Sequence, residues 1–571
     1  MNKLEVVVVM LLPLLAQAAG PTRDTTADLI LTNGHVLTMD PSQPAAEAVA
    51  IRDGRIVFVG SGKEATALRG TSTRTIDLAG RTLLPGLADA HVHPKEGEFL
   101  RRRLCDVRGF TVAEGLRKMK HCAGIAPPGD WVVGYGWYDL DNIGYDKLTR
   151  SELESLVPDR KMAVISRDHH TVWVNPRALA SIGIQDDTSA PPGGEIIRDP
   201  VTRQPTGMLI DAAAAPVVEQ IVHHSGYSAP IPDLLQSALQ HLNSFGITSI
   251  VDAMADESVL RGYLELDRSG KLNTHVTVAM GVTPANYRTE IPRIAQRRKS
   301  MQSGNVTVGF VKVFGDGNPE VGLASMLSRD GRTDSKSPGY YSDEQMHELL
   351  ELAERQELPV FVHVIGDGAA RQALDAIAAA RQAHPQSRLR HTLTHLCWVD
   401  TADLPRFRQL GVIANLQEGW LAPSAYGGPP GYDYARSTAA GPIGPWLGGR
   451  VTPYRDIVDA GARIASGSDW FYTDENPWND LEAGTTSMDP GGPNRQPMLP
   501  NYTVDVARLL AARTTGSAYQ VGREADLGMI RTGYRADLVV VDRDPLTVAP
   551  QTLHDMRVDM TLFAGRVIFS R

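Results

Sequence analysis

Short apolar runs that alternate with polar positions mark both ends of the chain as β-structure. Residues 27–85 contain several such runs, and residues 48–59 predict a hairpin that turns at Asp53-Gly54. Residues 536–542 predict a strand of the same kind near the other end. Neither end is long enough to bury a core alone. We therefore expect residues 27–85 and 525–571 to pack together as one small composite β-sandwich, with two unrelated edge ribbons as the alternative.

Between these ends, continuous apolar strands alternate with amphipathic helices. Strands are predicted at 305–314, 359–365, 389–396, 412–416 and 462–466, and helices at 369–380, 404–410 and 454–460. A further helix is predicted to begin at Ser342, where Gln345 completes a capping box. This alternation favours an α/β fold with a (β/α)8 TIM-like barrel over residues 86–524. A doubly wound open sheet is the alternative, but no Gly-x-Gly-x-x-Gly follows an early strand.

One part of the predicted barrel breaks this pattern. The segment at about 95–240 is less regular and is rich in proline and glycine. We interpret it as an insertion after the first barrel strand, which would shape a pocket for a substrate.

Composition and charge narrow the class of protein. Of the 571 residues, 42% are hydrophobic and 22% are charged, which is typical of a globular enzyme. The net charge of −9 is spread without long runs, which argues against nucleic acid or an anionic membrane as a partner. After the first residues, no run of about 18 apolar residues predicts a membrane span.

Residues 1–19 have the pattern of a signal peptide. Lys3 belongs to a short polar start, residues 6–16 form an apolar core, and Ala16-Gln17-Ala18 supplies the small residues before a cleavage site. This apolar core is short for a membrane span. We therefore expect the mature protein to be periplasmic or secreted, with no membrane partner after cleavage, and a homodimer is one option for its assembly.

The chain has three cysteines: Cys105, Cys122 and Cys397. Their number and spacing fit neither a disulfide scaffold nor a cysteine-rich zinc site. Cys105 and Cys122 could form one disulfide in an oxidising compartment, and two buried thiols are the alternative. We expect Cys397 to serve packing rather than chemistry.

His91 and His93 end the apolar run that begins at Leu83. Side chains alternate across a strand, so two residues spaced in this way point to the same side. Two imidazoles at the end of a strand make half of a metal site. A lone pair of this kind carries little weight, because histidines also occur on surfaces and in cores.

Further residues of the ligand type follow in chain order, each at the end of a predicted strand. They are Lys312, His363, His395 and Asp469. The carboxyl ends of barrel strands form one face, where active sites lie. Taken singly, each histidine has a structural interpretation and Asp469 could cap a turn or helix. Six such residues from five strands, in order, predict a metal site.

Lys312 is unusual because its strand is otherwise apolar. A buried ammonium is costly unless it is paired or loses its charge. Lys312 therefore either reaches an acid such as Asp316 or serves the metal site as an anionic carbamate, and the residues alone leave both options open.

A series of longer motifs runs through nearly the whole mature chain. In order they are LLPGLADAHVHP, DHHTVWVNPRAL, PPGGEIIRD, PTGML, VKVFGDG, HVIGDGA, GSDW and YRADLVVVDRDP. By these motifs the chain resembles the amidohydrolase superfamily, specifically the amidohydrolase-3 branch of YtcJ-like metal-dependent hydrolases. The resemblance implies a barrel with a composite β-sandwich and one or two divalent ions, usually zinc.

The resemblance also implies how the ligands would be shared. His91, His93 and Asp469 would hold one ion. His363 and His395 would hold the second, with carboxylated Lys312 as the bridge.

The chain departs from the common pattern of this family at three places. Thr394 stands where glutamate commonly precedes the ligand histidine, and Glu418 stands where proline commonly follows Gln417. His169 replaces a common glycine. None of these changes removes a predicted ligand.

The ligand types predict hydrolysis by metal-activated water. A zinc-bound water has a pKa of about 7, and the metal also polarises the substrate carbonyl. Asp469 would take the proton of this water and pass it to the leaving amine. His170 is a candidate donor to the oxyanion, with a structural role as the alternative. Trp137 would line the substrate pocket unless it is simply buried.

We therefore expect cleavage of a C–N bond (amide, N-formyl or carbamoyl) in a small molecule. An esterase or deaminase of the same superfamily is the nearest alternative. A non-catalytic, exported metal-binding protein with a regulatory role is another, although the intact ligand set argues against it. A metal-free structural barrel would leave Lys312 buried without purpose.

Overall fold

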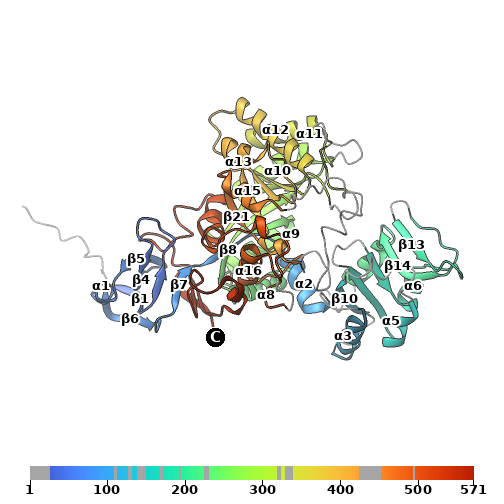
Figure 1. Ribbon diagram of the computed structural model, residues 1–571, viewed down its shortest axis with the longest axis horizontal. Coiled ribbons are helices and arrows are strands. Elements are labelled where there is room, and N and C mark those ends of the chain that lie inside the picture. The colour runs from blue at the N-terminus through green and yellow to red at the C-terminus, as the bar shows by residue number, and fades with distance from the viewer. Residues whose placement is uncertain are drawn as a thin grey trace, which may run out of the picture.

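The computed structural model shows a central barrel flanked by a β-region formed by both chain ends and by an outlying mixed sheet (Figure 1). The structure describes residues 26–107, 112–125, 131–137, 150–166, 171–191, 194–223, 230–317, 323–327, 339–423, 452–492 and 496–571. The predicted signal peptide lies outside these ranges. Within them, no helix has the length and apolar character that crossing a membrane requires.

Eight strands form the barrel sheet, and every neighbouring pair in it is parallel. In chain order they are β8 (Leu87–Val92), β15 (Ile247–Ala255), β16 (His275–Gly281), β17 (Val306–Phe314), β18 (Val360–Val364), β19 (Thr392–His395), β20 (Ile413–Leu416) and β21 (Arg463–Ser466). The last strand returns to the first, since the backbone N–H of Asp469 donates to the carbonyl of His91 over 2.7 Å. The predicted α/β barrel is confirmed, with the sheet nearly closed.

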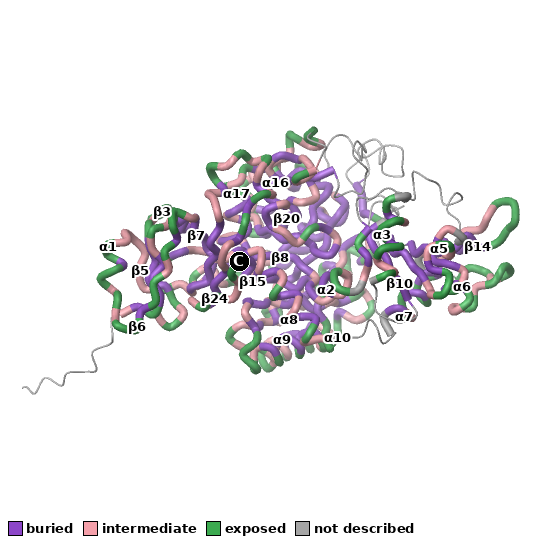
Figure 2. Tube along the Cα trace, turned by 90° about the horizontal axis from the view of Figure 1, so that it is seen from below, coloured by how far each residue is buried: buried purple, intermediate pink, exposed green. Residues whose placement is uncertain are grey.

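The helices that follow or precede these strands cover the outside of the barrel. They are α8 (Ile231–Asn243), α9 (Glu257–Arg268), α10 (Tyr287–Ser300), α11 (Asp343–Arg355), α12 (Asp367–Ala383), α13 (Leu404–Leu410), α15 (Tyr454–Asp459), α16 (Pro477–Thr486), α17 (Val506–Ala511) and α18 (Ser517–Gln520). Helix α11 begins after Ser342 with the predicted capping box to Gln345. Helices pack on the outer face of the strands, and the side chains of the barrel interior pack on the inner face. Most strand positions are therefore buried (Figure 2).

Side chains from seven of the eight strands fill the barrel interior. Phe310 and Phe361 provide most of the volume, and small residues such as Ala90, Ala279 and Ala465 make room for them. A filled interior makes the barrel a rigid support for residues at its carboxyl end.

Strands from both chain ends lie in one sheet. Its order is β24-β23-β22-β7-β2-β3, in which β22 (Leu538–Val541) pairs antiparallel with β7 (Thr82–Pro85). The remaining strands are β2 (His35–Leu37), β3 (Ala45–Ala46), β23 (Val558–Phe563) and β24 (Arg566–Ser570). A second sheet has the order β5-β4-β1-β6, and residues of both sheets share one apolar cluster. The limits of a composite sandwich at 27–85 and 525–571 stay a prediction.

The second sheet contains the hairpin expected at the N-terminal end. It comprises β1 (Ala27–Thr32), β4 (Ala48–Arg52), β5 (Arg55–Gly60) and β6 (Arg69–Asp77), with the short helix α1 (Gly62–Thr66). Asp53 and Gly54 turn the hairpin with φ of 50° and 72°. Positive φ at both positions is what a tight turn between twisted strands requires.

A six-stranded mixed sheet occupies the chain between β8 and β15, in the segment that the sequence marks as irregular. Its order is β13-β14-β12-β11-β10-β9. The elements are α2 (Pro94–Arg103), β9 (Cys105–Asp106), α3 (Val112–Ile125), β10 (Trp131–Trp137), α5 (Arg150–Leu156), β11 (Lys161–Ser166), β12 (Thr171–Val174), α6 (Pro176–Ser181), β13 (Gly194–Arg198), β14 (Pro205–Asp211) and α7 (Ala215–His223). This part is therefore more regular than the sequence suggests, and it has its own apolar cluster.

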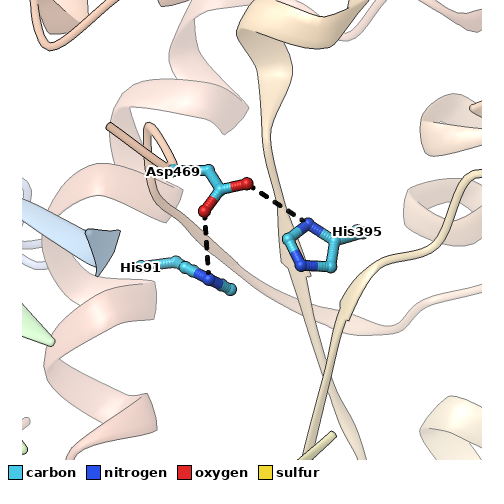
Figure 3. Close-up of side chains that lie close together, drawn as sticks. All are labelled: His91, His395 and Asp469. Atoms are coloured by element: carbon cyan, nitrogen blue, oxygen red, sulfur yellow. Dashed lines mark ion pairs between the residues drawn. The ribbon is translucent and has the colours of Figure 1, made fainter. Parts of the chain in front are cut away.

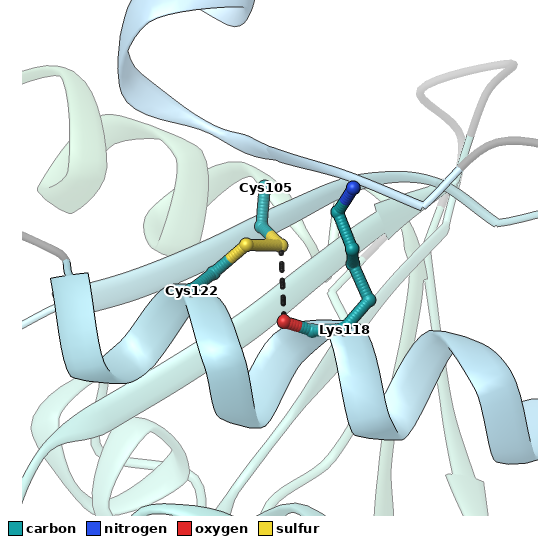
Figure 4. The surroundings of a disulfide bond; sticks show 3 residues. All are labelled: Cys105, Lys118 and Cys122. Atoms are coloured by element: carbon teal, nitrogen blue, oxygen red, sulfur yellow. Dashed lines mark hydrogen bonds between the residues drawn. A yellow bond between two sulfur atoms is a disulfide. The ribbon is translucent and has the colours of Figure 1, made fainter.

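Cys105 and Cys122 are joined by a disulfide, which decides between the two options left by the sequence (Figure 4). The bond links the start of β9 to helix α3, and the Cα atoms are 5.9 Å apart. The Sγ atom of Cys105 lies 3.6 Å from the carbonyl oxygen of Lys118. Cys397 is buried and takes no part in this disulfide.

Removing this disulfide should destabilise the outlying sheet. The bond closes a loop with a sequence separation of 17, for which the loss of chain entropy predicts about 3 kcal/mol. The Cys105→Ser, Cys122→Ser double variant should therefore unfold at lower denaturant concentration and be cleaved sooner by protease. Cys397→Ala serves as the control, because it removes a thiol without opening a cross-link. Equal protease resistance of the double variant and the wild type would contradict the prediction.

Candidate metal centre

The six predicted ligands lie on five strands or directly after them, at the carboxyl end of the barrel. His91 lies in β8, and His93 follows this strand at the start of α2. Lys312, His363 and His395 lie in β17, β18 and β19. Asp469 follows β21. The barrel topology thus brings together residues that are up to 378 positions apart in the sequence (91 to 469).

His91, His395 and Asp469 form the most compact group (Figure 3). One ligand atom from each residue lies within 4.8 Å of the others, and all three residues are buried. The Oδ1 atom of Asp469 is 3.3 Å from Nε2 of His91 and 3.2 Å from Nε2 of His93. Its Oδ2 atom is 3.9 Å from Nδ1 of His395. This group combines residues that the resemblance divides between two ions.

His363 and Lys312 lie next to this group. The ring centroids of His363 and His395 are 4.4 Å apart. The ammonium of Lys312 lies 4.9 Å from the ring centroid of Phe361 and 5.2 Å from that of Phe314. Among the described residues no carboxylate lies within ion-pair distance of it.

Asp316, the acid that could have paired with Lys312, is used elsewhere. Its carboxylate accepts backbone N–H groups of Ser325, Ile365 and Gly366 over 2.7 to 3.0 Å. Burial raises the pKa of Asp316 to about 7 despite these bonds. The simple structural interpretation of Lys312 therefore lacks its partner.

The buried histidines are neutral at pH 7 and so have the form that binds metal. Burial, followed by the charges of Lys312 and neighbouring histidines, lowers the pKa of His91 well below its usual value. Burial likewise lowers the pKa of His363 and of His395. Burial also lowers the pKa of Lys312 to about 7, against the opposing charge of Asp469.

Three buried polar atoms of the predicted ligands have no hydrogen-bond partner. They are Nε2 of His363, Nδ1 of His395 and Oδ1 of Asp469. Buried polar groups are almost always satisfied, so such a cluster calls for an explanation. Neutral imidazoles and a carboxylate that converge without partners fit a divalent cation, and this donor set suits zinc.

Hydrogen bonds behind His91 fix the tautomer of its ring. Its Nδ1 lies 2.8 Å from Oγ1 of Thr394, and that hydroxyl donates onward to Oδ1 of Asn415 over 3.1 Å. Nδ1 of His91 must therefore be the donor, which leaves the lone pair of Nε2 free for a metal. Thr394 was noticed in the sequence only as a departure from a common pattern, and the structure gives it this contact.

Two of the predicted ligands have left-handed backbone conformations. The φ angles are 75° for His395 and 59° for Asp469. Such conformations are strained for residues other than glycine and cluster at functional sites. The backbone N–H of His395 is held by Oε1 of Gln417 over 3.0 Å. The surroundings thus fix the direction of both side chains.

Two other predicted site residues are placed less fully. Trp137 ends β10, but its side chain is not among those described. His170 lies outside the described residues. One aromatic contact that the sequence did not indicate is Trp420, whose ring stacks on His395 with a centroid distance of 4.9 Å and an interplanar angle of 7°.

Comparisons with known proteins agree with this geometry. A family model described as Amidohydrolase family matches residues 74–569. The chain is 26% identical to an N-substituted formamide deformylase of Arthrobacter pascens, over 95% of this chain and 98% of that protein. It is also 26% identical to the putative amidohydrolase YtcJ of Bacillus subtilis (strain 168), over 94% and 98%.

A solved structure shows the same fold. It is an uncharacterized metal-dependent hydrolase from Pyrococcus horikoshii OT3, with a TM-score of 0.67 and 21% identity. The match covers 91% of this chain and 99% of that chain. The match thus extends over nearly the whole length of both proteins.

Proposed function

Because the chain belongs to the Amidohydrolase family, whose fold neighbours include metal-dependent hydrolases, we propose that it hydrolyses a C–N bond in a small molecule. The bond would be that of an amide, an N-formyl group or a carbamoyl group. The observation that carries the proposal is the buried group of His91, His395 and Asp469, whose ligand atoms lie within 4.8 Å of one another and in which Nδ1 of His395 and Oδ1 of Asp469 have no hydrogen-bond partner. The relative named an N-substituted formamide deformylase supports this choice of bond.

The metal ligands would be His91, His93 and Asp469 for one ion and His363 and His395 for a second, with Lys312 between them. The neutral imidazoles favour zinc. When bound, such an ion polarises a carbonyl and makes water a nucleophile near neutral pH.

Lys312 would act in this centre as a carbamate. It is buried in the middle of the histidines, and Asp316 is occupied elsewhere. Carbamate formation requires a neutral amine, and burial lowers the pKa of Lys312 to about 7. A carbamate would replace a costly buried cation with an anionic oxygen ligand.

Side chains of the protein would then accept and donate the protons of the reaction. The carboxylate of Asp469 would accept a proton from the attacking water as the oxygen of this water adds to the carbonyl carbon. The C–N bond then breaks, and Asp469 returns the proton to the leaving nitrogen. The products are an amine and a carboxylic acid, or an amine and a carbamic acid where the bond is that of a carbamoyl group. His170 is our proposed donor to the oxyanion, and Trp137 our proposed wall of the substrate pocket.

The disulfide between Cys105 and Cys122 supports a place of action in an oxidising compartment. We therefore propose a periplasmic or secreted enzyme that meets its small-molecule substrate outside the cytoplasm.

Metal content and amine release test this function together. Protein purified without added metal should contain about two zinc ions per chain and should release amine from some members of a panel of N-formyl, N-acyl and carbamoyl compounds. Turnover of esters or ring amines instead would keep the hydrolase and replace the bond. Absence of both metal and turnover after reconstitution with zinc and bicarbonate would overturn the proposal in favour of a non-catalytic role.

A further inference from the structure

A second cluster of buried charges lies next to the candidate metal centre and has no part in the mechanism above. Its centre is Arg513, whose side chain is 0% exposed. Nε of Arg513 donates to Glu418 over 2.8 Å, and Nη2 donates to Asp480 over 2.5 Å. Nη1 lies 4.0 Å from Oδ2 of Asp89. Burying a guanidinium with three carboxylates is costly.

One of the three carboxylates contacts the loop that carries Asp469, and the other two contact or lie in the elements that flank it. This loop, residues 467–476, runs from the end of β21 to the start of α16. Glu418 accepts a hydrogen bond from Ser466, the last residue of β21. Asp480 lies in the first turns of α16, just beyond the loop. Arg513 thus connects to the chain on both sides of Asp469.

Asp89 holds the first part of the same loop. Its Oδ1 accepts the backbone N–H of Ser468 over 2.9 Å, and its Oδ2 accepts the hydroxyl of Ser468 over 2.6 Å. The next residue is Asp469, whose N–H donates to His91. The chain is therefore held before the loop at Ser466, within the loop at Ser468 and after the loop at Asp480, and the carboxylates involved surround one guanidinium.

Close packing leaves this cluster little freedom. A Cβ atom at Gly419 would collide with the carboxylate of Asp480, and one at Gly484 would collide with the side chain of Glu418. Arg513 itself lies in a π-helical turn, Ala512–Gly516, which packs against β8 and β21. A π-turn inside a helix often marks a functional position.

We propose that Arg513 is a positioning residue for Asp469: with Glu418, Asp480 and Asp89 it clamps the 467–476 loop so that the Asp469 carboxylate faces His91, His93 and His395. This inference rests on the proposed function, in which Asp469 is a metal ligand and the proton acceptor. Such a clamp is required because the left-handed backbone conformation of Asp469 persists only where its surroundings enforce it. A guanidinium suits the task, since its planar fork donates in several fixed directions at once.

Zinc affinity provides a test that does not depend on the substrate. Full-length protein is stripped with chelator and titrated with Zn²⁺ against a competing indicator. Arg513→Lys keeps the charge but loses the fork, and it should weaken zinc binding by about 10–100-fold, as the loss of an outer contact to a metal ligand does. Arg390→Lys is the matched control, because Arg390 makes a similar forked pair with Glu524 that is remote from the Asp469 loop. The control should keep zinc affinity within about twofold.

A double-mutant cycle separates positioning from general destabilisation. If Arg513 acts through Asp469, Arg513→Lys should have almost no further effect on zinc affinity in an Asp469→Ala background. An undiminished effect in that background would overturn the proposal. Where an amide substrate is known, the same variant should lower kcat with little change in KM.

A second variant covers the case in which Arg513→Lys does not fold. Ser466→Ala removes the hydroxyl held by Glu418 and leaves every buried charge in place. It should also weaken zinc binding, and wild-type affinity in this variant would overturn the clamp. A wild-type protein that binds no zinc would overturn the proposed function as well, whereas normal wild-type binding with unchanged variants overturns the clamp alone.

Discussion

Asp469→Asn should reduce turnover by about 10²–10⁴-fold while leaving the barrel folded. Asparagine has nearly the same shape, but it cannot accept the proton of the attacking water and it is a poorer ligand. The backbone around residue 469 should persist, because Asp89 holds Ser468 and His91 holds the N–H of residue 469. The measurement is the initial rate of amine release at saturating zinc, with circular dichroism and zinc content recorded on the same samples.

Asp459→Asn is the matched control for this substitution. This control makes the same aspartate-to-asparagine change, but the side chain of Asp459 is 55% exposed and pairs with Arg508 at the surface. It should retain the wild-type rate. Hydrolysis by Asp469→Asn at a rate near that of the wild type would show that another group accepts the proton.

The order of strands and helices over the second half of the barrel could be predicted because its pattern is strong. Residues 305–314, for example, became β17 with its ends shifted by one residue or less. The helix that begins after Ser342 could be predicted because its capping box is formed by two residues that are close in the sequence. Where burial follows directly from periodicity and capping, the sequence is sufficient.

The outlying sheet shows where prediction from local sequence patterns fails. Strand β10 contains glycine at positions 134 and 136, which resembles a loop in the sequence. In the structure, Gly134 lets Met119 of helix α3 pack against the strand, since a Cβ atom there would collide with the sulfur. Gly134 weakens the strand pattern in the sequence, yet a tertiary contact requires it. Such a contact cannot be read from a local sequence pattern.

The candidate site was predictable in its membership but not in its arrangement. Parallel strands bring their carboxyl ends to one face, so the ligand series could be collected in order. That His395 lies with His91 and Asp469 depends on side-chain directions, which backbone strain at His395 and Asp469 sets. Arg513 was missed because its partners, Glu418, Asp480 and Asp89, are far from it in sequence. The only trace was Glu418, a departure from the common pattern.

Lys312→Met should lower the zinc content from about two ions per chain to about one or fewer and reduce turnover accordingly. Methionine fills a similar volume without nitrogen, so it removes the carbamate and leaves no large cavity. Elemental mass spectrometry of protein reconstituted with zinc and bicarbonate gives the stoichiometry. Lys161→Met is the control, since Lys161 also lies over an aromatic ring, that of Trp131, but belongs to the outlying sheet. It should retain wild-type zinc and turnover.

The stability of Lys312→Met makes the experiment decisive between the two interpretations of this lysine. An ordinary buried ammonium destabilises the fold, so its replacement by an apolar side chain should raise the thermal midpoint of the metal-free protein and leave zinc binding unchanged. A bridging carbamate contributes only when metal is present, so its loss should lower the midpoint of the zinc-loaded protein, because ligand binding stabilises the native state in proportion to its affinity. Wild-type protein prepared without bicarbonate should then show the same low zinc content as Lys312→Met. Adding bicarbonate should restore the zinc content of the wild type but not that of the variant. Full zinc stoichiometry in Lys312→Met would exclude the bridge, because both ions would then bind without the carbamate oxygens.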